Sequence, residues 1–416
     1  MQKQFGLIGE KLGHSHSKTL HGFLADYRYD LWPMPMEAVD SFMREGSFDG
    51  MNVTIPYKKT VIPYLSGIGD TAKRIGAVNT IVRREDGSLY GDNTDFYGMM
   101  EMARRAKINF LGQKTLILGS GGTSLTAVDV VRENGGMPVV ISRNGENNYQ
   151  NLHLHRDAAY IINTTPLGMY PNPHAQAVDL RDFPKLQGVL DVVYNPLRTQ
   201  FLMQAEALGI SCEGGLSMLI YQGVLASELF EGKSLPRERV VQAERALRRS
   251  ITNLVLIGMP GCGKSTIGRK LADELNMPLV DLDVEIEKTA GMTIPQIFAA
   301  EGEAGFRKRE SEQVEKYGSI GGRVLVTGGG AVKDPLNRKY LRMNGFVVHI
   351  TRDLDLLSME GRPLSQNREA LQTMWQERKP MYEACCDAHF ANDTTIEACV
   401  QNIREAFDEA LCAERP

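Results

Sequence analysis

A stretch that combines glycines with one lysine and one serine, GMPGCGKS, occupies residues 258 to 265. The apolar run NLVLIG before it reads as a strand, and TIGRKLADEL after it reads as a helix. Such a loop curls backbone N–H groups around phosphate oxygens, while its lysine reaches the terminal phosphates and its serine ligates Mg²⁺. The spacing therefore predicts an ATP and magnesium site made of Gly258, Gly261, Gly263, Lys264, Ser265 and Thr266.

Two carboxylates follow the next strand-like run, MPLVDLDV. Asp281 and Asp283 alternate along the chain, so we expect them on one face at the carboxyl edge of a sheet, beside the glycine loop. In that place one carboxylate suits a contact to Mg²⁺ and the other a contact to an acceptor hydroxyl. The pair therefore predicts an acceptor site next to the phosphates.

Three arginines further along the chain, Arg307, Arg362 and Arg378, suggest a clamp for anionic groups on this phosphate-handling part. Each arginine alone is more often a surface charge, and Arg307 could simply pair with Glu310 on the same helical face. The strand-like run RVLVTGGG ends in three glycines, residues 328 to 330, which let a substrate lie close to the backbone.

Polar side chains in the N-terminal part are of the types that bind a hydroxylated acid. Ser15 and Ser17 alternate, so both hydroxyls are expected to face one way, and two hydroxyl donors suit a carboxylate. Lys58 and Asp95 form a candidate proton-transfer pair. Amides and a hydroxyl accompany them at Asn52, Thr54 and Asn79. Singly these residues fit ordinary turns or surface charges; together they predict an acid–base pair inside a polyol site.

A second glycine loop, GSGGTS, starts at Gly119 after the strand-like run TLIL and precedes a helix. Gly119, Gly121 and Gly122 give the turn and the close approach of a dinucleotide phosphate loop. Ser142 stands where an acidic residue would hold the ribose of NAD, and Arg143 is beside it. An arginine there favours the 2′-phosphate of NADP. The alternative interpretation of Arg143 is an exposed charge after a strand.

The composition bounds the class of protein. The 416 residues suffice for two or three domains, and 42% hydrophobic with 24% charged residues is ordinary globular composition. With 47 basic and 51 acidic residues, the net charge of −4 speaks against nucleic-acid and membrane partners. The chain shows no signal-peptide pattern, no membrane-spanning run and no C-x-x-C pair among its six cysteines. We expect a cytoplasmic monomer or homodimer with small-molecule substrates.

The element pattern predicts an α/β protein with parallel sheets. Residues 1–106 read as an α/β substrate domain, and 107–236 as a Rossmann-like domain whose final helix region packs back on the substrate domain. Residues 237–250 have helical spacing and read as a connector, which places a P-loop α/β domain at 251–416.

The C-terminal motifs closely resemble those of the shikimate kinases, in the order GxxGxGKS, D-x-D, F-R-x-x-E, G-G-G, G-R-P-L and E-R-x-x-x-Y, over residues 252 to 410. The resemblance implies that Lys264 and Ser265 hold ATP and Mg²⁺, that Asp281 contacts the metal and that Asp283 binds shikimate hydroxyls. It implies that the shikimate carboxylate and ring are held by Arg307, Arg378, Gly329 and Gly330, with Arg362 on a lid over the transferring phosphate. Ser365 departs from the leucine usual in this family.

The N-terminal motifs N-V-T-x-P-x-K, G-A-V-N-T and G-x-N-T-D resemble those of the shikimate dehydrogenases, over about residues 5 to 232. The later runs NTTPLGM, DVVYNPLRT and GGLSMLIYQG are also typical of that family. The resemblance implies a catalytic pair, Lys58 and Asp95. It implies a substrate site of Ser15, Ser17, Asn52, Thr54, Asn79, Asp95 and Gln222. It implies an NADP site of Gly119, Gly121, Gly122, Ser142, Arg143, Thr165, Met169, Tyr194 and Gly215.

Two departures from the dehydrogenase pattern stand out. Lys18 replaces the proline that usually follows the second serine, and only residues 144 to 162 separate SR from NTTPLGM, where family members usually fit a further helix and strand. The cofactor domain is therefore expected to be trimmed on one edge.

Two consecutive steps of one pathway follow from the two resemblances: reduction of 3-dehydroshikimate with NADPH, then phosphorylation of the 3-hydroxyl with ATP. In one alternative the dehydrogenase half is a shikimate-binding regulatory module on a working kinase. In another, the P-loop half phosphorylates a different polyol, as gluconate kinases do.

Overall fold

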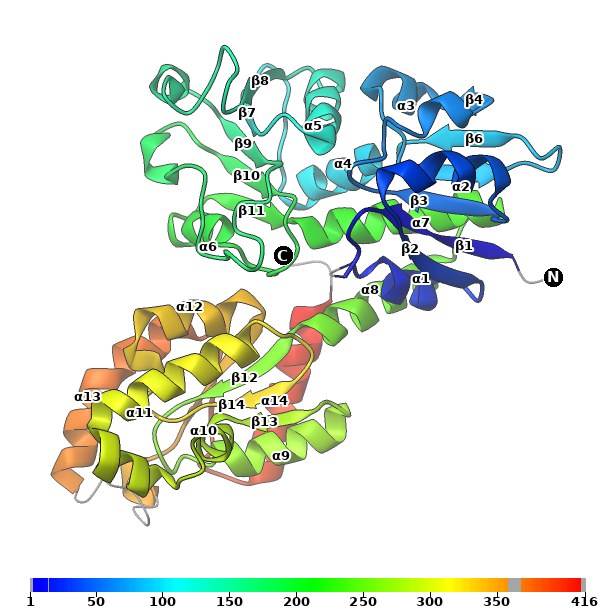
Figure 1. The fold of residues 1–416 in the computed structure, drawn as a ribbon. Coiled ribbons are helices and arrows are strands. Elements are labelled where there is room, and N and C mark those ends of the chain that lie inside the picture. Colours follow the sequence, from blue (N-terminus) through cyan, green and yellow to red (C-terminus); the bar gives the residue numbers. More distant parts are fainter. Residues whose placement is uncertain (1–2, 14, 358–367, 413–416) are drawn as a thin grey trace. The chain divides into compact units, whose positions relative to one another are not determined.

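The computed structural model describes residues 3–13, 15–357 and 368–412, and the chain divides into two compact units, 1–247 and 248–416 (Figure 1). We call them the N-terminal unit and the C-terminal unit and describe each by itself. The N-terminal unit contains two sheets, and the C-terminal unit contains one.

The first sheet of the N-terminal unit is mixed, with strand order β2-β1-β3-β5-β6-β4. Its strands are β1 (Gln4–Gly9), β2 (Arg28–Pro33), β3 (Gly50–Val53), β4 (Gly67–Ile68), β5 (Thr80–Arg83) and β6 (Leu89–Asp92). The accompanying helices are α1 (Ser17–Leu24), α2 (Val39–Glu45), α3 (Asp70–Ile75) and α4 (Asp95–Arg105). Ile8, Met51 and Ile81 are fully buried between sheet and helices, so the carboxyl ends of β1 and β3 are fixed by apolar packing.

The second sheet of this unit is parallel, with strand order β11-β10-β9-β7-β8. Its strands are β7 (Lys114–Leu118), β8 (Met137–Ile141), β9 (Tyr160–Asn163), β10 (Gly188–Asp191) and β11 (Ser211–Gly214). The helices α5 (Gly122–Glu133), α6 (Gln200–Ala207) and α7 (Gly215–Glu231) connect or follow these strands (Figure 1). Strands β7, β9 and β10 are continuous apolar runs because a parallel sheet is covered on both faces.

Helix α7 ties the two sheets of the N-terminal unit together. It packs closely on α4, where a Cβ added to Gly98 would lie 2.7 Å from the Met218 carbonyl oxygen. Near its end, Phe230 stacks on Phe5 of β1 with ring centroids 4.6 Å apart. The glycine permits an approach that any side chain would prevent, so α7 packs on α4 next to the parallel sheet and reaches β1 of the mixed sheet through Phe230.

Strand β8 is the edge of the parallel sheet. Met137 N donates to Gln113 O, and Ile141 O accepts from Gly119 N, so these two residues face β7. Along a strand, the backbone N–H and C=O groups of successive residues point alternately to the two sides. Those of Pro138 and Val140 therefore point away from β7. Pro138 therefore stands at an outward position where another residue would offer an N–H group.

The C-terminal unit has one parallel sheet with strand order β13-β14-β12-β15-β16. The strands are β12 (Asn253–Ile257), β13 (Leu279–Asp281), β14 (Val324–Val326), β15 (Gly345–Thr351) and β16 (Ala388–Ala391). The helices are α9 (Lys264–Leu275), α10 (Leu282–Ala290), α11 (Ile294–Gly318), α12 (Pro335–Met343), α13 (Arg368–Cys385) and α14 (Ile396–Leu411). Gly302, with φ 68° and ψ −175°, interrupts α11 with a kink that its missing Cβ allows.

Helix α8 (Arg237–Ile251) contains the boundary between the units. Within the N-terminal unit, Arg105 of α4 donates to Glu244 of α8 at 2.8 Å, and Leu247 is fully buried. Within the C-terminal unit, Arg249 donates to the Leu275 carbonyl. The chain thus passes from one unit to the other as a helix. No helix of the described residues is long and apolar enough to cross a membrane.

Candidate active sites

Lys58 and Asp95 meet in the N-terminal unit. Lys58 Nζ lies 2.5 Å from Asp95 Oδ2, and their side chains are only 14% and 9% exposed. Lys58 belongs to the turns after β3, and Asp95 opens α4, where the helix N-terminus favours a carboxylate. The sequence predicted this pair from types alone; the structure places an amine and a carboxylate where one proton can be shared.

The N-terminus of α4 is held by Asn79. Thr94 N donates to Asn79 Oδ1 at 2.7 Å, and Asn79 Nδ2 donates to Thr94 Oγ1 at 3.0 Å. Thr80 Oγ1 adds a third contact to Asn79 Oδ1 at 3.1 Å. Asn79 therefore sets the position of Asp95 and keeps one amide hydrogen for another partner.

Asn52 is buried next to Asn79 and Thr80. Its Oδ1 accepts from the Tyr29 hydroxyl at 2.8 Å, and its Nδ2 donates to Thr80 Oγ1 at 3.1 Å. Sequence reasoning missed Tyr29, Thr80 and Thr94. The two threonines adjoin predicted residues in the runs AVNT and NTD, so their motifs carried a signal, whereas nothing in the sequence singled out Tyr29.

Ser15 and Ser17 do lie together, but the reason is not strand alternation. Ser17 is the first residue of α1, and its backbone N donates to Ser15 Oγ at 3.2 Å, with the two hydroxyl oxygens 3.1 Å apart. A turn at a helix start brings them together. Thr54 follows β3 and donates its N–H to the Ile8 carbonyl at 3.0 Å, and Gln222 is buried in α7, where its Nε2 donates to the Leu219 carbonyl at 2.9 Å.

The glycine loop after β7 lies close to the acid–base pair. Gly119 has φ 110°, a conformation that favours glycine. A Cβ added to Gly121 would meet nothing within 4 Å, and one added to Gly122 would lie 3.9 Å from Lys58 Cδ. The loop thus offers exposed backbone at the start of α5 beside Lys58. That arrangement fits a dinucleotide with its phosphates on the helix N-terminus.

Ser142 and Arg143 follow β8 in a loop that asparagines stabilise. Ser142 N donates to Asn147 O at 3.1 Å, Asn148 Nδ2 donates to Gly145 O at 3.1 Å, and Asn148 N donates to Asn151 Oδ1 at 2.8 Å. Arg143 is exposed at the start of this loop. The loop lies in the short interval, residues 144 to 162, where the sequence predicted a trimmed edge, and its asparagine-rich run NGENNYQN was a signal that sequence reasoning did not use.

The remaining predicted cofactor residues lie on loops at the carboxyl edge of the same sheet. Thr165 and Met169 follow β9, and Met169 is exposed. Tyr194 follows β10, and Gly215 opens α7 with its N–H donated to Val193 O at 3.1 Å. A Cβ on Gly215 would overlap the Val192 carbonyl, so only glycine fits there.

The P-loop after β12 is formed by left-handed glycines. Gly258, Gly261 and Gly263 have φ values of 145°, 84° and 102°, which favour glycine. Lys264 is buried, and its Nζ donates to the carbonyls of Gly258 at 2.9 Å and Met259 at 3.0 Å. The ammonium group is thereby held inside the loop, where polyphosphate oxygens would be its partners.

A hydroxyl and a carboxylate lie together at the start of α9. Ser265 Oγ donates to Asp281 Oδ2 at 2.8 Å, and Ser265 and Thr266 are exposed in the first turn of the helix. Asp281 Oδ1 also accepts from Asp283 N at 3.1 Å. Oxygen donors of this kind fit Mg²⁺, and Ser265 with Asp281 would hold it.

The sequence predicted that Asp283 shares a strand face with Asp281, but Asp283 is not part of the strand. Strand β13 ends at Asp281, which caps α10, and Asp283 belongs to the first turn of that helix. Burial and the neighbouring Asp281 charge raise the pKa of Asp283. The two carboxylates are adjacent because of the cap, and the raised pKa favours Asp283 as a proton acceptor.

The glycine run after β14 approaches both acidic and basic side chains. A Cβ added to Gly328 would lie 2.8 Å from Glu310 Oε1 and 2.9 Å from Asp283 Oδ1. Glu310 is buried and accepts from Arg307 Nη1 at 2.6 Å, and a Cβ on Gly330 would overlap the Arg307 guanidinium. The predicted pairing of Arg307 with Glu310 is present, and it orients Arg307 over the glycine run.

Gly329 connects this run to α13 and to the P-loop. Its carbonyl accepts from Arg378 Nη1 at 3.0 Å and from the Tyr382 hydroxyl at 2.6 Å. A Cβ on Gly329 would lie 2.6 Å from Pro260 Cδ. Sequence reasoning named Arg378 and missed the role of Tyr382. Arg362 and Ser365 lie outside the described residues.

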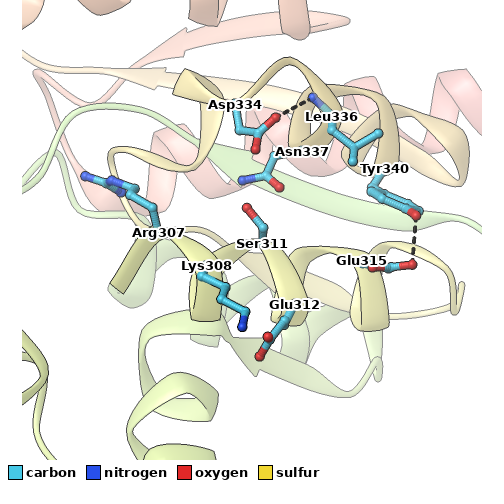
Figure 2. A pocket seen from close by; sticks show the side chains of 9 residues that line it. All are labelled: Arg307, Lys308, Ser311, Glu312, Glu315, Asp334, Leu336, Asn337 and Tyr340. Atoms are coloured by element: carbon cyan, nitrogen blue, oxygen red, sulfur yellow. Dashed lines mark hydrogen bonds between the residues drawn. The ribbon is translucent and has the colours of Figure 1, made fainter. Parts of the chain in front are cut away.

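A groove of about 360 Å³ lies between α11 and α12 (Figure 2). Arg307 is at one end, and at the other end the Tyr340 hydroxyl donates to Glu315 at 2.8 Å. Figure 2 shows the Arg307 guanidinium pointing away from Tyr340. The groove therefore borders the acceptor region without containing Asp283 or the P-loop.

Comparison with known proteins assigns these two regions. The family model of shikimate kinase matches residues 260–408, and that of the shikimate dehydrogenase substrate binding domain matches residues 7–81. Shikimate dehydrogenase (NADP(+)) of Clostridium perfringens is 39% identical over 253 residues, which cover 55% of this chain and 93% of the relative. The enzyme of the same name from Geobacillus kaustophilus is 33% identical over 277 residues, 60% of this chain and 100% of the relative.

Solved structures agree over the N-terminal unit. Shikimate 5-dehydrogenase from Thermus thermophilus, in complex with NADP(H) and shikimate, matches with a TM-score of 0.54 and 31% identity over 59% of this chain and 99% of that one. A chorismate mutase/shikimate 5-dehydrogenase fusion protein from Clostridium acetobutylicum matches with a TM-score of 0.54 and 33% identity over 58% of this chain and 96% of that one.

Proposed function

Because the chain belongs to the shikimate dehydrogenase family and carries a shikimate kinase domain, we propose that it catalyses two consecutive reactions on one molecule. The N-terminal unit reduces 3-dehydroshikimate to shikimate with NADPH. The C-terminal unit transfers the terminal phosphoryl group of ATP to the 3-hydroxyl, which gives shikimate 3-phosphate. The observation that carries the proposal is the coexistence of a Lys58–Asp95 pair at 2.5 Å and a complete P-loop in one chain.

In the N-terminal unit, the protein supplies a proton and orientation. NADPH, when bound, supplies the hydride that the carbonyl carbon receives. Lys58 and Asp95 hold the proton that the carbonyl oxygen takes up, because they share it at hydrogen-bond distance. Asn79 and Thr54 orient the ring hydroxyls together with Asn52 and Gln222. Ser15 and Ser17 donate to the substrate carboxylate.

The NADP site of this unit is formed by loops at the carboxyl edge of the parallel sheet. Gly119, Gly121 and Gly122 approach the phosphates, and Arg143 with Ser142 binds the ribose 2′-phosphate. Loop residues and the start of α7 complete the site: Thr165, Met169, Tyr194 and Gly215. This assignment is supported by the open space beside Gly121 and by the exposed position of Arg143.

In the C-terminal unit, the protein positions the reacting groups and stabilises their charge. ATP and Mg²⁺, when bound, supply the phosphoryl group and its counter-charge. Lys264 stabilises the transferring phosphoryl group, Ser265 and Asp281 hold the metal, and the other P-loop residues cradle the phosphates. Asp283 orients the acceptor hydroxyl and accepts its proton.

The acceptor side of the C-terminal unit binds an acid. Arg307 and Arg378 bind the shikimate carboxylate, and Gly329 and Gly330 line its ring. The chain acts on small molecules in the cytoplasm as a monomer or homodimer. It has no nucleic-acid or membrane partners, and its net charge of −4 supports that last point.

Paired assays of the purified chain test the proposal. One assay follows NADP⁺ reduction with shikimate, and the other follows ADP formation with shikimate and ATP. We expect both activities from one preparation. ADP formation without NADP⁺ reduction would leave the N-terminal unit as a shikimate-binding module. ADP formation with gluconate in place of shikimate would overturn the acceptor assignment.

A further inference from the structure

Asp191 is a fully buried carboxylate at the carboxyl end of β10, and the acid–base chemistry above does not use it. Three donors surround it. Asn163 Nδ2 donates to its Oδ1 at 2.9 Å and Val193 N at 3.1 Å, while Thr199 Oγ1 donates to its Oδ2 at 2.6 Å. Asn163 and Thr199 are themselves buried. Hydrogen bonds thus replace the water that a buried carboxylate has lost, and they come from three segments.

The first segment is the loop after β9. Asn163 Oδ1 accepts from Thr165 N at 3.1 Å and from Thr165 Oγ1 at 2.6 Å. Thr165 in turn lies against the glycine loop, because a Cβ added to Gly119 would be 3.0 Å from Thr165 Cγ2. The amide of Asn163 therefore links the position of Asp191 to Thr165 and to the phosphate loop.

The second and third segments are the loop after β10 and the start of α6. Val193 donates its N–H to Asp191 and accepts at its carbonyl from Gly215 N at 3.1 Å. Tyr194 is the next residue along the chain. Thr199 caps α6 by accepting from Leu202 N at 3.3 Å. One carboxylate thus joins segments that carry Thr165, Tyr194 and Gly215.

We infer that Asp191 is a positioning residue, which holds the loops after β9 and β10 in the arrangement that binds the dinucleotide. The inference rests on the proposed function for the identity of that dinucleotide. Asp191 acts through Asn163 and Val193, so it changes cofactor affinity and leaves the Lys58–Asp95 pair in place. A residue that served only stability would lower the melting temperature of the unit and leave the KM for NADPH unchanged.

The test compares Michaelis constants in Asp191→Asn. Burial raises the pKa of Asp191 to about 7, so the assays are run at pH 8, where the native carboxylate is charged. The asparagine amide has the shape of the carboxylate, but its NH₂ group is a hydrogen-bond donor and faces side chains or backbone that also donate. We expect the KM for NADPH to rise about tenfold, the usual scale of one lost charged hydrogen bond. The KM for 3-dehydroshikimate and the rate of ADP formation should stay near their native values.

Val189→Ala is the matched control on the same strand. Val189 is fully buried two residues before Asp191, so its truncation lowers the melting temperature of the unit through a cavity. We expect no change in the KM for NADPH. The inference fails if this control raises that KM as much as Asp191→Asn does, or if Asp191→Asn raises both Michaelis constants equally or neither.

A second variant, Thr199→Val, tests the inference if Asp191→Asn abolishes reduction of 3-dehydroshikimate while ADP formation persists. It removes one donor and keeps the carboxylate, and we expect a rise of a few-fold in the KM for NADPH alone, on the scale of one net hydrogen bond. An unchanged KM in that variant would overturn the inference. If the native chain itself shows no NADP-dependent oxidation of shikimate, the proposed function fails first, and this outcome is distinct from an active native chain with unmoved constants.

Discussion

Two glycine loops follow strands of the two parallel sheets, and they differ in the charge they carry. The loop after β7 continues into α5 with a glycine, serine and threonine composition and contains no cation, although Gly122 lies beside Lys58, which follows β3 of the mixed sheet. The loop after β12 includes its own cation, because Lys264 is buried and bonded to loop carbonyls. Both loops precede a helix, and both contain glycine at positive φ: Gly119 in the first loop, and Gly258, Gly261 and Gly263 in the second.

The difference follows from the two kinds of chemistry. A hydride acceptor needs the dinucleotide to be bound in place, and its proton comes from a pair on another sheet. Phosphoryl transfer needs positive charge at the group that moves, so the binding loop is also the catalytic loop. Removing the charge of the second loop should therefore abolish a reaction, whereas removing the charge of Arg143, which we propose binds the 2′-phosphate, should change the affinity for the cofactor.

Lys264→Ala should have the largest effect. The substitution removes the only cation described within the P-loop, and charge on the transferring phosphoryl group is left without a partner. ADP formation with shikimate should fall below detection in a coupled assay, while NADP⁺ reduction stays at the native rate. Lys270→Ala, on the same helix but paired with Glu397, is the control and should keep both activities. Residual ADP formation at a tenth of the native rate would contradict the assignment.

Lys58→Ala and Asp95→Ala should come next. Each removes half of the buried pair, and lost acid–base catalysis usually costs roughly 10²-fold in turnover. The rate of dehydroshikimate reduction measures the effect, and ADP formation by the same preparation shows that the chain is intact. Lys59→Ala, at an exposed neighbour, should change neither rate. Near-native reduction by either pair variant would show that another group carries the proton.

Arg143→Ala should have a smaller and selective effect. The KM for NADPH should rise by about tenfold, the scale of one charged hydrogen bond, and the KM for NADH should hardly change, because only NADPH carries the 2′-phosphate. Initial rates with the two cofactors give the ratio. Arg156→Ala removes an exposed arginine that precedes β9 and should leave the ratio unchanged. An equal rise for both cofactors would mean that Arg143 does not bind that phosphate.

A different prediction concerns acid stability, in which the units should behave alike. Each contains a buried histidine: burial lowers the pKa of His21 to about 3 and that of His349 to about 4. The folded state favours the neutral imidazole ring over the protonated one. The stability that each buried histidine contributes is therefore complete above the unfolded-state pKa near 6.5, and it is lost as the pH falls toward 4. The loss is about 1.4 kcal/mol per pH unit for one such group.

His349→Phe measures this contribution in the C-terminal unit. His349 stacks on Tyr382 with ring centroids 4.7 Å apart, and phenylalanine can keep that stacking. Between pH 6.5 and 4, the temperature at which ADP formation is irreversibly lost should fall less steeply in the variant than in the native chain. The corresponding temperature for dehydroshikimate reduction should be the same in both proteins. Parallel slopes for the kinase activity would contradict the assigned cause.

From the sequence, the residues proposed to contact ligands were easier to predict than the residues that position them. Lys58, Asp95 and Lys264 were predicted because their chemistry requires a residue type at a spacing. Tyr29 and Asp191 were not found, because their partners lie across the sheet and only the folded chain brings them together. Tyr29 reaches Asn52 from 23 residues away, and Asp191 reaches Asn163 from 28.

Two pairs of residues are adjacent, as the sequence predicted, but for a different structural reason. Asp281 and Asp283 were expected to share a strand face, but the chain turns into α10 at Asp281, whose carboxylate caps the helix. Ser15 and Ser17 are close for a similar reason, at the start of α1. Alternation and a helix start both bring residues i and i+2 to one side over so short a stretch, and pattern alone does not separate them.

Pro138 has a consequence for the chain in concentrated solution. An edge strand with a free ladder can recruit the edge of another molecule and start an aggregate. Pro138 cannot donate at its outward position in β8, so a foreign strand laid along this edge would lose one hydrogen bond near the start of β8. The missing donor makes this edge of the sheet a poorer template for self-association.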